Sequence, residues 1–179
     1  TAYEISTRDW SSDVCSSDLF MIQVTDNESA KDKRLWAAPY LFPGTWCLLA
    51  GMSTSGSLTR WFRDSFAKEL IHAEESGGEN AYAVLTNEAM ATPKGAEGVL
   101  TLPYFSGERT PIMDPRARGL IFGLSLPHTR GHLYRSVLEG MGHGVRQHVD
   151  LFTSIGARDR KSTRLNSSHE WISRMPCSA

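Results

Sequence analysis

The sequence predicts an α/β fold in which a mixed β-sheet packs against helices, with a disordered tail at each end. Short apolar runs of strand length alternate with segments whose apolar residues recur every three or four positions. Some connections between these segments are short, which favours antiparallel pairs beside parallel ones. This alternation covers residues 20–157, the size of one ordinary domain or of a piece of a larger one.

Three strands and a helix are expected in the first half of this region. The apolar run 20–24, which begins at Phe20, predicts the first strand; a short second strand is expected near Trp36, and TWCLLAGM (45–52) predicts the third. The segment STSGS then leads into a helix. Its apolar residues recur at helical spacing at Leu58, Trp61, Phe62, Phe66 and Leu70.

The second half repeats the alternation. The pair Gly77-Gly78 breaks the chain, and residues 80–90 read as a helix with Tyr82, Leu85 and Ala89 on one face. Strands are expected at 98–105 and 120–126, joined by the polar loop 106–119. Thr129 is a suitable N-cap for a final helix. The apolar stripe of that helix is predicted to contain Leu133, Val137, Met141, Val145, Val149 and Phe152.

Three glycines interrupt the final helix. Gly140, Gly142 and Gly144 each cost helix stability, and a closely packed surface is one reason to tolerate them.

Composition excludes several classes of protein. The chain has 19 Lys and Arg against 20 Asp and Glu, so no basic excess indicates a nucleic-acid partner. The apolar run around Cys47 is far too short to span a membrane, and no metal-ligand spacing is present. Cys47 reads as a buried, inert thiol in a reducing compartment, so a cytoplasmic protein is expected.

The two ends, residues 1–19 and 158–179, are related at the level of DNA. Residues 5–9 (ISTRD) can be encoded by ATATCCACTCGTGAC, and the complementary strand in a shifted frame gives HEWI, residues 169–172. The correspondence continues along both tails, and protein selection gives no reason for it. Both tails also resemble the translation of a sequencing-library adapter, so we expect them to be adapter-derived and not native. Composition alone also allows ordinary disordered arms.

Two segments are candidates for chemistry. In AGMSTSGSLTRWF (50–62), small residues join a strand to a helix whose positive N-terminal end favours a phosphate; the alternative is a helix simply capped by Ser55 or Ser57. The loop 106–119 gathers Glu108, Arg109, Asp114, Arg116 and Arg118. Loops of this kind carry function, but a structural pair between Arg109 and Asp114 is an equally simple interpretation.

GLIFGLSLPHTRGHLYRSVLE, residues 119–139, resembles the second signature of the FGGY carbohydrate kinases. Every constrained position of that pattern is met, by Gly119, Ile121, Gly123, Leu124, His132, Leu133, Ser136, Val137, Leu138 and Glu139. The upstream LPYFSGERTPIMDPRARG is similar to the xylulokinase-like branch. The segment GMSTSGSLTRWFRD looks like the nucleotide-facing turn and helix of the same domain.

The resemblance implies a partial actin-like ATPase (ribonuclease H-like) domain over residues 20–157. It implies ATP and Mg²⁺ as cofactors and a sugar as acceptor of the γ-phosphoryl group. Gly56, Ser57 and Arg60 are then expected to face the nucleotide, although glycerol kinase relatives carry Gln where Arg60 stands. The family's catalytic Asp is expected upstream of Phe20. No catalytic residue is therefore assigned here, and the chain alone is expected to be inactive.

The expected substrate is a pentulose such as xylulose. Alternatives are a kinase for glycerol, gluconate or ribulose, and a non-catalytic nucleotide-binding or interaction module. The expected partners are the sugar and ATP, without nucleic acid or membrane, and a homodimer is compatible with the family.

Overall fold

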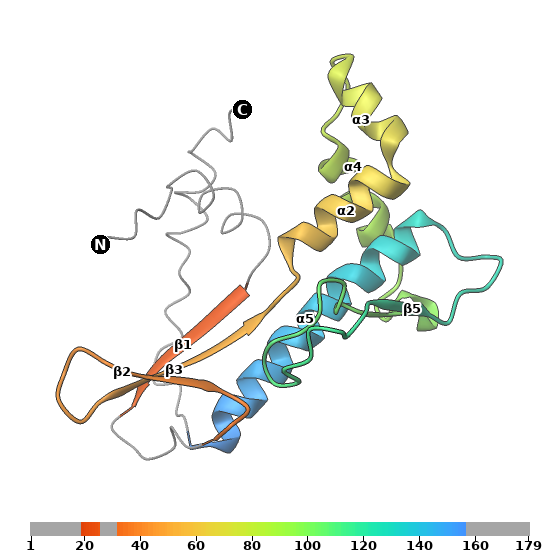
Figure 1. Cartoon of the computed structure of the whole chain (residues 1–179). Helices are drawn as coiled ribbons and strands as arrows, with labels where there is room; N and C mark the ends of the chain where they lie inside the picture. Colours follow the sequence, from red (N-terminus) through yellow and green to blue (C-terminus); the bar gives the residue numbers. More distant parts are fainter. Residues whose placement is uncertain (1–18, 26–31, 157–179) are drawn as a thin grey trace.

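The computed structural model describes residues 19–25 and 32–156, and of residues 19–25 only the backbone (Figure 1). The expected tails lie outside the described residues except for Leu19, which begins the first strand. Their adapter origin therefore stays a prediction.

The first sheet contains the three strands expected from the sequence. Its order is β1 (Leu19–Thr25), β3 (Trp46–Met52) and β2 (Trp36–Pro39), so β3 is central and both pairings are antiparallel. Leu48, Ala50 and Met52 of β3 are buried at the two-residue spacing of a strand with one face in the core. Cys47, which directly precedes Leu48 in β3, is only half-buried, so the expectation of a buried thiol is wrong.

The border that the sequence placed at Phe20 does not coincide with the start of a structural element. Strand β1 begins one residue earlier, at Leu19, which pairs with Met52, and Phe20 pairs with Gly51. The border was set by the DNA-level relation between the tails, which is independent of where a strand starts, and it stays a prediction; the strand itself is defined by backbone pairing with β3, which includes Leu19. Phe20 is thus an internal residue of β1.

Two helices occupy the region where the sequence predicted one. Helix α2 (Gly56–Phe66) ends at Ala67, whose backbone leaves the helical region, and α3 (Lys68–Glu75) begins directly afterwards. Ala67 is fully buried, so the bend lies in the core rather than at the surface. Leu58 and Phe62 of the predicted face are buried, whereas Phe66 is 45% exposed.

Helix α4 (Ala81–Ala91) matches its expected range. The Asn80 side chain accepts hydrogen bonds from the backbone N–H groups of Tyr82 and Ala83, which satisfies two donors of the first turn. Leu85 and Ala89 are buried as predicted.

The second sheet has two antiparallel strands, both shorter than expected, β4 (Leu100–Leu102) and β5 (Leu120–Phe122). A 3₁₀ turn, η2 (Ala96–Gly98), precedes β4. Gly123 ends β5 with φ +89°, and a Cβ there would lie 2.4 Å from the carbonyl oxygen of Gly98. A glycine of the sequence signature is thus required by backbone packing. All strand pairs among the described residues are antiparallel, so no parallel pair of the expected mixed sheet lies within them.

Helix α5 (Arg130–Ser154) is the long element that joins the two halves of the core (Figure 1). Its first half packs on α2 and α4 through Tyr134 and Val137, and its second half packs on β3 through Leu151 and Phe152.

The predicted apolar stripe of α5 is wrong in the middle. Val145 and Val149 are 36% and 41% exposed, whereas Gly140 and His148 lie on the buried face. The reason is a close approach: a Cβ on Gly140 would lie 2.3 Å from the Thr101 carbonyl oxygen of β4, and one on Gly144 would lie 2.6 Å from Met52. The close packing that the sequence suggested for the three glycines is therefore found at Gly140 and Gly144. Gly142 has no neighbouring atom within 4 Å of a Cβ position.

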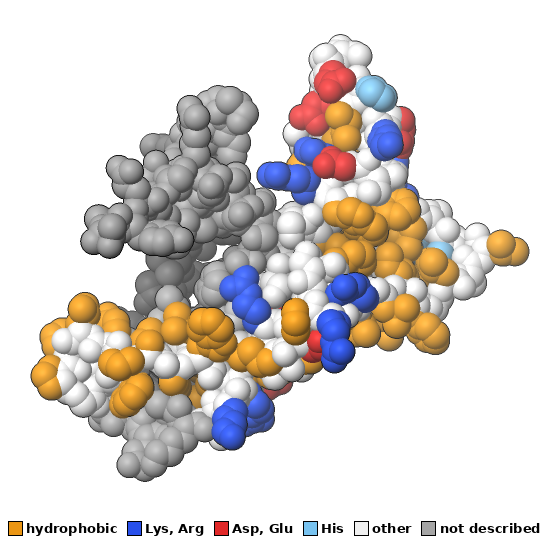
Figure 2. Space-filling view, in the orientation of Figure 1, with side chains coloured by type: hydrophobic (Ala, Val, Ile, Leu, Met, Phe, Trp, Pro, Cys, Tyr) orange, Lys and Arg blue, Asp and Glu red, His pale blue; other side chains and the backbone are white. Residues whose placement is uncertain are grey.

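Large apolar side chains remain exposed at the end of the first sheet. Figure 2 shows them around β2, at the left of the view. They are Trp36, Tyr40, Leu41, Phe42 and Trp46, between 38% and 83% exposed. None of the described helices is both long and apolar enough to cross a membrane.

Candidate nucleotide-facing site

The turn between β3 and α2 is the centre of the candidate site. β3 ends at Met52, residues 53–55 form the turn, and α2 begins at Gly56. Met52 and Thr54 are each 1% exposed, so the chain is anchored in the core on both sides of Ser53 and then emerges at the exposed Gly56.

The three residues expected to face a nucleotide lie on the first turns of α2. Gly56 is the first helical residue and Arg60 follows one turn later, and both are exposed. The Ser57 hydroxyl is buried and has no hydrogen-bond partner among the described residues. Gly56 and Arg60 therefore share an accessible end of the helix, whereas the Ser57 side chain points away from it into the protein.

The start of α2 is not closed by a side-chain cap. The Ser55 side chain makes no capping hydrogen bond, and the first turn contains no acidic residue. A simple Ser cap by Ser55 or Ser57, the alternative raised from the sequence, is therefore wrong. The N-terminal end of a helix carries partial positive charge and attracts anions, and Arg60 adds a full positive charge one turn away.

The loop 106–119 is joined to this turn by hydrogen bonds. The Ser106 N–H donates to Thr54 Oγ1 at 3.2 Å, and the Thr110 N–H donates to the Gly51 carbonyl oxygen at 3.4 Å. The Arg109 Nε–H donates to Ser53 Oγ at 3.3 Å. Asp114 pairs with Arg116 instead, so the Arg109–Asp114 pair considered from the sequence is replaced by contacts that join the loop to the turn.

Glu108 is the most deeply buried charged residue in this loop. It is 4% exposed, and its Oε1 accepts hydrogen bonds from the Ser53 N–H at 3.1 Å and from the Arg109 N–H at 2.7 Å. Burial raises the pKa of the Glu108 carboxyl, although both hydrogen bonds and the charges of His148 and Arg109 favour the ionised form. The sequence placed Glu108 in a functional loop but gave no sign of its burial, since charged residues rarely lie inside.

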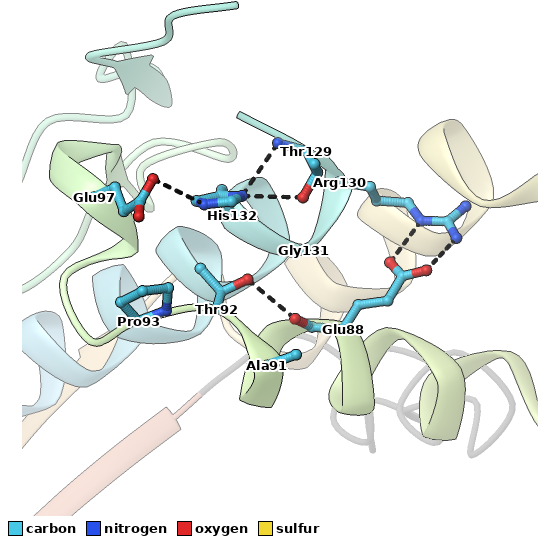
Figure 3. A pocket seen from close by; sticks show the side chains of 9 residues that line it. All are labelled: Glu88, Ala91, Thr92, Pro93, Glu97, Thr129, Arg130, Gly131 and His132. Atoms are coloured by element: carbon cyan, nitrogen blue, oxygen red, sulfur yellow. Dashed lines mark hydrogen bonds and ion pairs between the residues drawn. The ribbon is translucent and has the colours of Figure 1, made fainter. Parts of the chain in front are cut away.

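A hollow of about 550 Å³ lies away from this turn, between α4, η2 and the start of α5 (Figure 3). Arg130 crosses it to pair with Glu88, and His132 Nε2 lies 3.3 Å from Glu97. The Thr129 N–H donates to His132 Nδ1 at 3.1 Å, and Thr129 is the N-cap residue of α5, as expected. These charged side chains pair with one another, so we interpret the hollow as a structural contact between α4, η2 and α5.

The aspartates of the described region are also paired. Asp32 contacts Arg34, which lowers the pKa of the Asp32 carboxyl to about 2, and Asp64 contacts Arg63. No group of three or more His, Cys, Asp or Glu among residues 19–25 and 32–156 is placed to hold a metal ion.

The catalytic Asp expected upstream of Phe20 lies outside the described residues. The backbone of Phe20 pairs with Gly51, which lies two residues before the turn at Ser53. The position of the catalytic Asp stays a prediction, and no catalytic residue is assigned among the described residues.

Comparison with known proteins decides the family. The model of the FGGY family of carbohydrate kinases, C-terminal domain, matches residues 16–165. The chain belongs to the FGGY family of carbohydrate kinases. The family match begins before Phe20 and ends after Ala157, so it extends past both expected borders, and those borders stay a prediction.

Relatives of this FGGY domain include kinases of different sugars. It is 38% identical to a gluconokinase of Bacillus subtilis over 54% of this chain and 19% of the relative. It is 32% identical to a xylulose kinase of Escherichia coli over 69% of this chain and 23% of the relative. The chain thus spans about a fifth of the length of these curated relatives.

The fold of the FGGY domain also matches solved structures. The crystal structure of xylulose kinase from Rhodospirillum rubrum superposes with a TM-score of 0.67 and 35% identity, over 79% of this chain and 27% of that one. The expected fold class is therefore confirmed.

Proposed function

We propose that this chain is part of the nucleotide-binding domain of an ATP-dependent sugar kinase. The kinase transfers the γ-phosphoryl group of ATP to a hydroxyl of a pentulose such as xylulose. The observation that carries the proposal is the N-terminal end of α2, where Gly56 and Arg60 are exposed, in a chain of the FGGY family.

The residues at this end fit a polyphosphate. Gly56 has no side chain to keep a phosphate from the backbone N–H groups, and Arg60 presents a permanent positive charge. Phosphoryl transfer depends mainly on positioning and on charge stabilisation, which are the contributions that such groups supply. Ser57 contributes through its backbone N–H, because its hydroxyl is buried.

Magnesium fits the proposal as a companion of the nucleotide. Mg²⁺ keeps several waters and is held largely through substrate phosphates rather than by an all-protein cage. The described residues offer no such cage of their own, so this chain's contribution is to bind and orient the phosphates that carry the ion.

Xylulose is preferred because xylulose kinases are similar to the larger part of this chain, in sequence and in structure. Gluconate is the second candidate, supported by the higher identity, 38%, to gluconokinase over a shorter stretch.

The acceptor is tested by measuring ADP release from the full-length enzyme with xylulose, ribulose, gluconate and glycerol in turn. The proposal expects kcat/KM to be highest for xylulose, by at least about tenfold, since a site built to hydrogen-bond one set of hydroxyls discriminates strongly. A maximum with gluconate would move the assignment to the second candidate. ADP release that no acceptor stimulates would contradict a sugar kinase.

A further inference from the structure

Glu108 presents a problem that the nucleotide-site proposal does not explain. An ionisable carboxyl is rarely buried without a charged partner, because removing it from water is costly. Glu108 is 4% exposed, and both hydrogen bonds to it come from backbone N–H groups. Its Oε2 is buried and has no hydrogen-bond partner among residues 19–25 and 32–156.

The contacts of Glu108 lead directly to the turn before α2. Its Oε1 joins the Ser53 N–H, 55 residues earlier in the chain, to the Arg109 N–H of its own loop. A single oxygen atom thus fixes the distance between the two backbones. The neighbouring contacts of Ser106 and Thr110 reach Thr54 and Gly51, so the loop holds the turn on both sides of Ser53.

We propose that Glu108 is a positioning residue, whose buried carboxyl fixes the Ser53 backbone and thereby holds the start of α2 in place for the nucleotide. The inference rests on the proposed nucleotide site, since it concerns the orientation of Gly56 and Arg60. An apolar residue would fill the same space but would leave the half-buried Ser53 N–H without the acceptor that Glu108 provides.

Protonation of Glu108 adds a pH dependence to this support. The groups that face it are His148 from α5, Arg109 from its own loop and Tyr104, whose pKa is raised by burial and by the Glu108 charge. His148 Nδ1 lies 2.7 Å from the Gly144 carbonyl oxygen, and its buried Nε2 has no partner among the described residues. Burial raises the pKa of Glu108 in the folded turn, so the folded turn binds the proton more tightly than the unfolded chain does. The support is therefore complete at low pH and weakens as pH rises through that pKa.

The test is amide hydrogen exchange of the 179-residue chain, compared among wild type, Glu108→Ala, Glu108→Gln and Glu97→Ala. Glu97 is a matched control, because it too is a glutamate that contacts α5, through His132, but it does not touch the turn. Loss of the hydrogen bond to the Glu108 carboxyl predicts that Glu108→Ala speeds exchange at Ser53 by at least about tenfold. Exchange in α4 should stay unchanged.

Glu108→Gln separates positioning from simple packing. Gln keeps an acceptor for Ser53, so protection of that amide should be restored to within about threefold of wild type at low pH. Its protection should not fall as pH rises from about 4 to about 8, whereas that of wild type should fall. If Glu108→Ala does not fold, this variant still shows whether the Glu108 carboxyl fixes the Ser53 backbone.

Two results would overturn the inference. One is Ser53 exchange in Glu108→Ala that equals that of Glu97→Ala, or that rises only together with every other amide. The other is the same pH-dependent loss of protection in Glu108→Gln as in wild type.

Titration with Mg-ADP separates this inference from the proposed function. Wild type that fails to bind Mg-ADP contradicts the nucleotide site, while exchange at Ser53 still decides whether Glu108 fixes the turn. Wild type that binds should lose at least about tenfold in affinity on Glu108→Ala and almost nothing on Glu97→Ala. Equal affinities of the two variants would overturn the link between Glu108 and the nucleotide.

Discussion

Replacing Phe62 with alanine is expected to lower the free energy of unfolding by about 3–5 kcal/mol, the usual cost of removing a buried aromatic ring. Phe62 is fully buried in α2, and its ring centroid lies 5.1 Å from those of both Phe66 and Tyr134. Because whole domains are stable by only about 5–15 kcal/mol, the variant should be largely unfolded near its former melting temperature. Urea unfolding followed by circular dichroism measures the change.

Leu126→Ala is the control for Phe62. Leu126 is fully exposed, so its truncation should change stability by less than about 0.5 kcal/mol. Similar losses in the two variants would show that α2 does not pack on α5 as described.

Two glycines of α5 should respond to alanine in opposite directions. A Cβ on Gly140 would lie 2.3 Å from the Thr101 carbonyl oxygen, so Gly140→Ala must push helix and strand apart and should cost about 1–3 kcal/mol or more. Gly142 has nothing within 4 Å of that position, so Gly142→Ala should stabilise the helix by about 0.5–1 kcal/mol. Thermal melts of both variants provide the comparison.

The test depends on the opposite signs of the two expected changes in stability. The same substitution two residues apart controls for helix propensity and for hydrophobicity. If both variants were stabilised, α5 would not lie against β4 at Gly140.

Local periodicity predicted most of the fold. The alternation of Leu48, Ala50 and Met52 and the spacing of Leu85 and Ala89 each depend on one face of one element, which a sequence pattern records directly. The break at Ala67 was missed because alanine favours helix, and only the packing of the two helices in the core sets the bend.

The errors in α5 have the same origin. An apolar pattern predicts burial of Val145, but the buried face is the one whose small residues admit a neighbouring backbone. Which of three glycines faces the strand depends on tertiary contact with Thr101, and the sequence does not contain that information.

The candidate site was likewise predicted in part from the sequence and missed in part. Small residues between a strand and a helix predicted the turn that precedes Gly56, since a strand–turn–helix segment is local in sequence. The support from Glu108 was not predicted, because it joins residues 55 positions apart and places a carboxyl where composition favours an apolar residue.

The central claim is that the start of α2 binds the phosphates of a nucleotide, and amide chemical shifts during an Mg-ADP titration test it most directly. The account predicts that shifts concentrate at residues 53–60 and that Arg60→Ala weakens binding about three- to thirtyfold, the effect of losing one charge-assisted contact. Arg34→Ala should bind as wild type does, since Arg34 is an exposed arginine that pairs with Asp32. Shifts that concentrate instead around Thr129 and His132, or equal affinities for wild type and Arg60→Ala, would contradict the account.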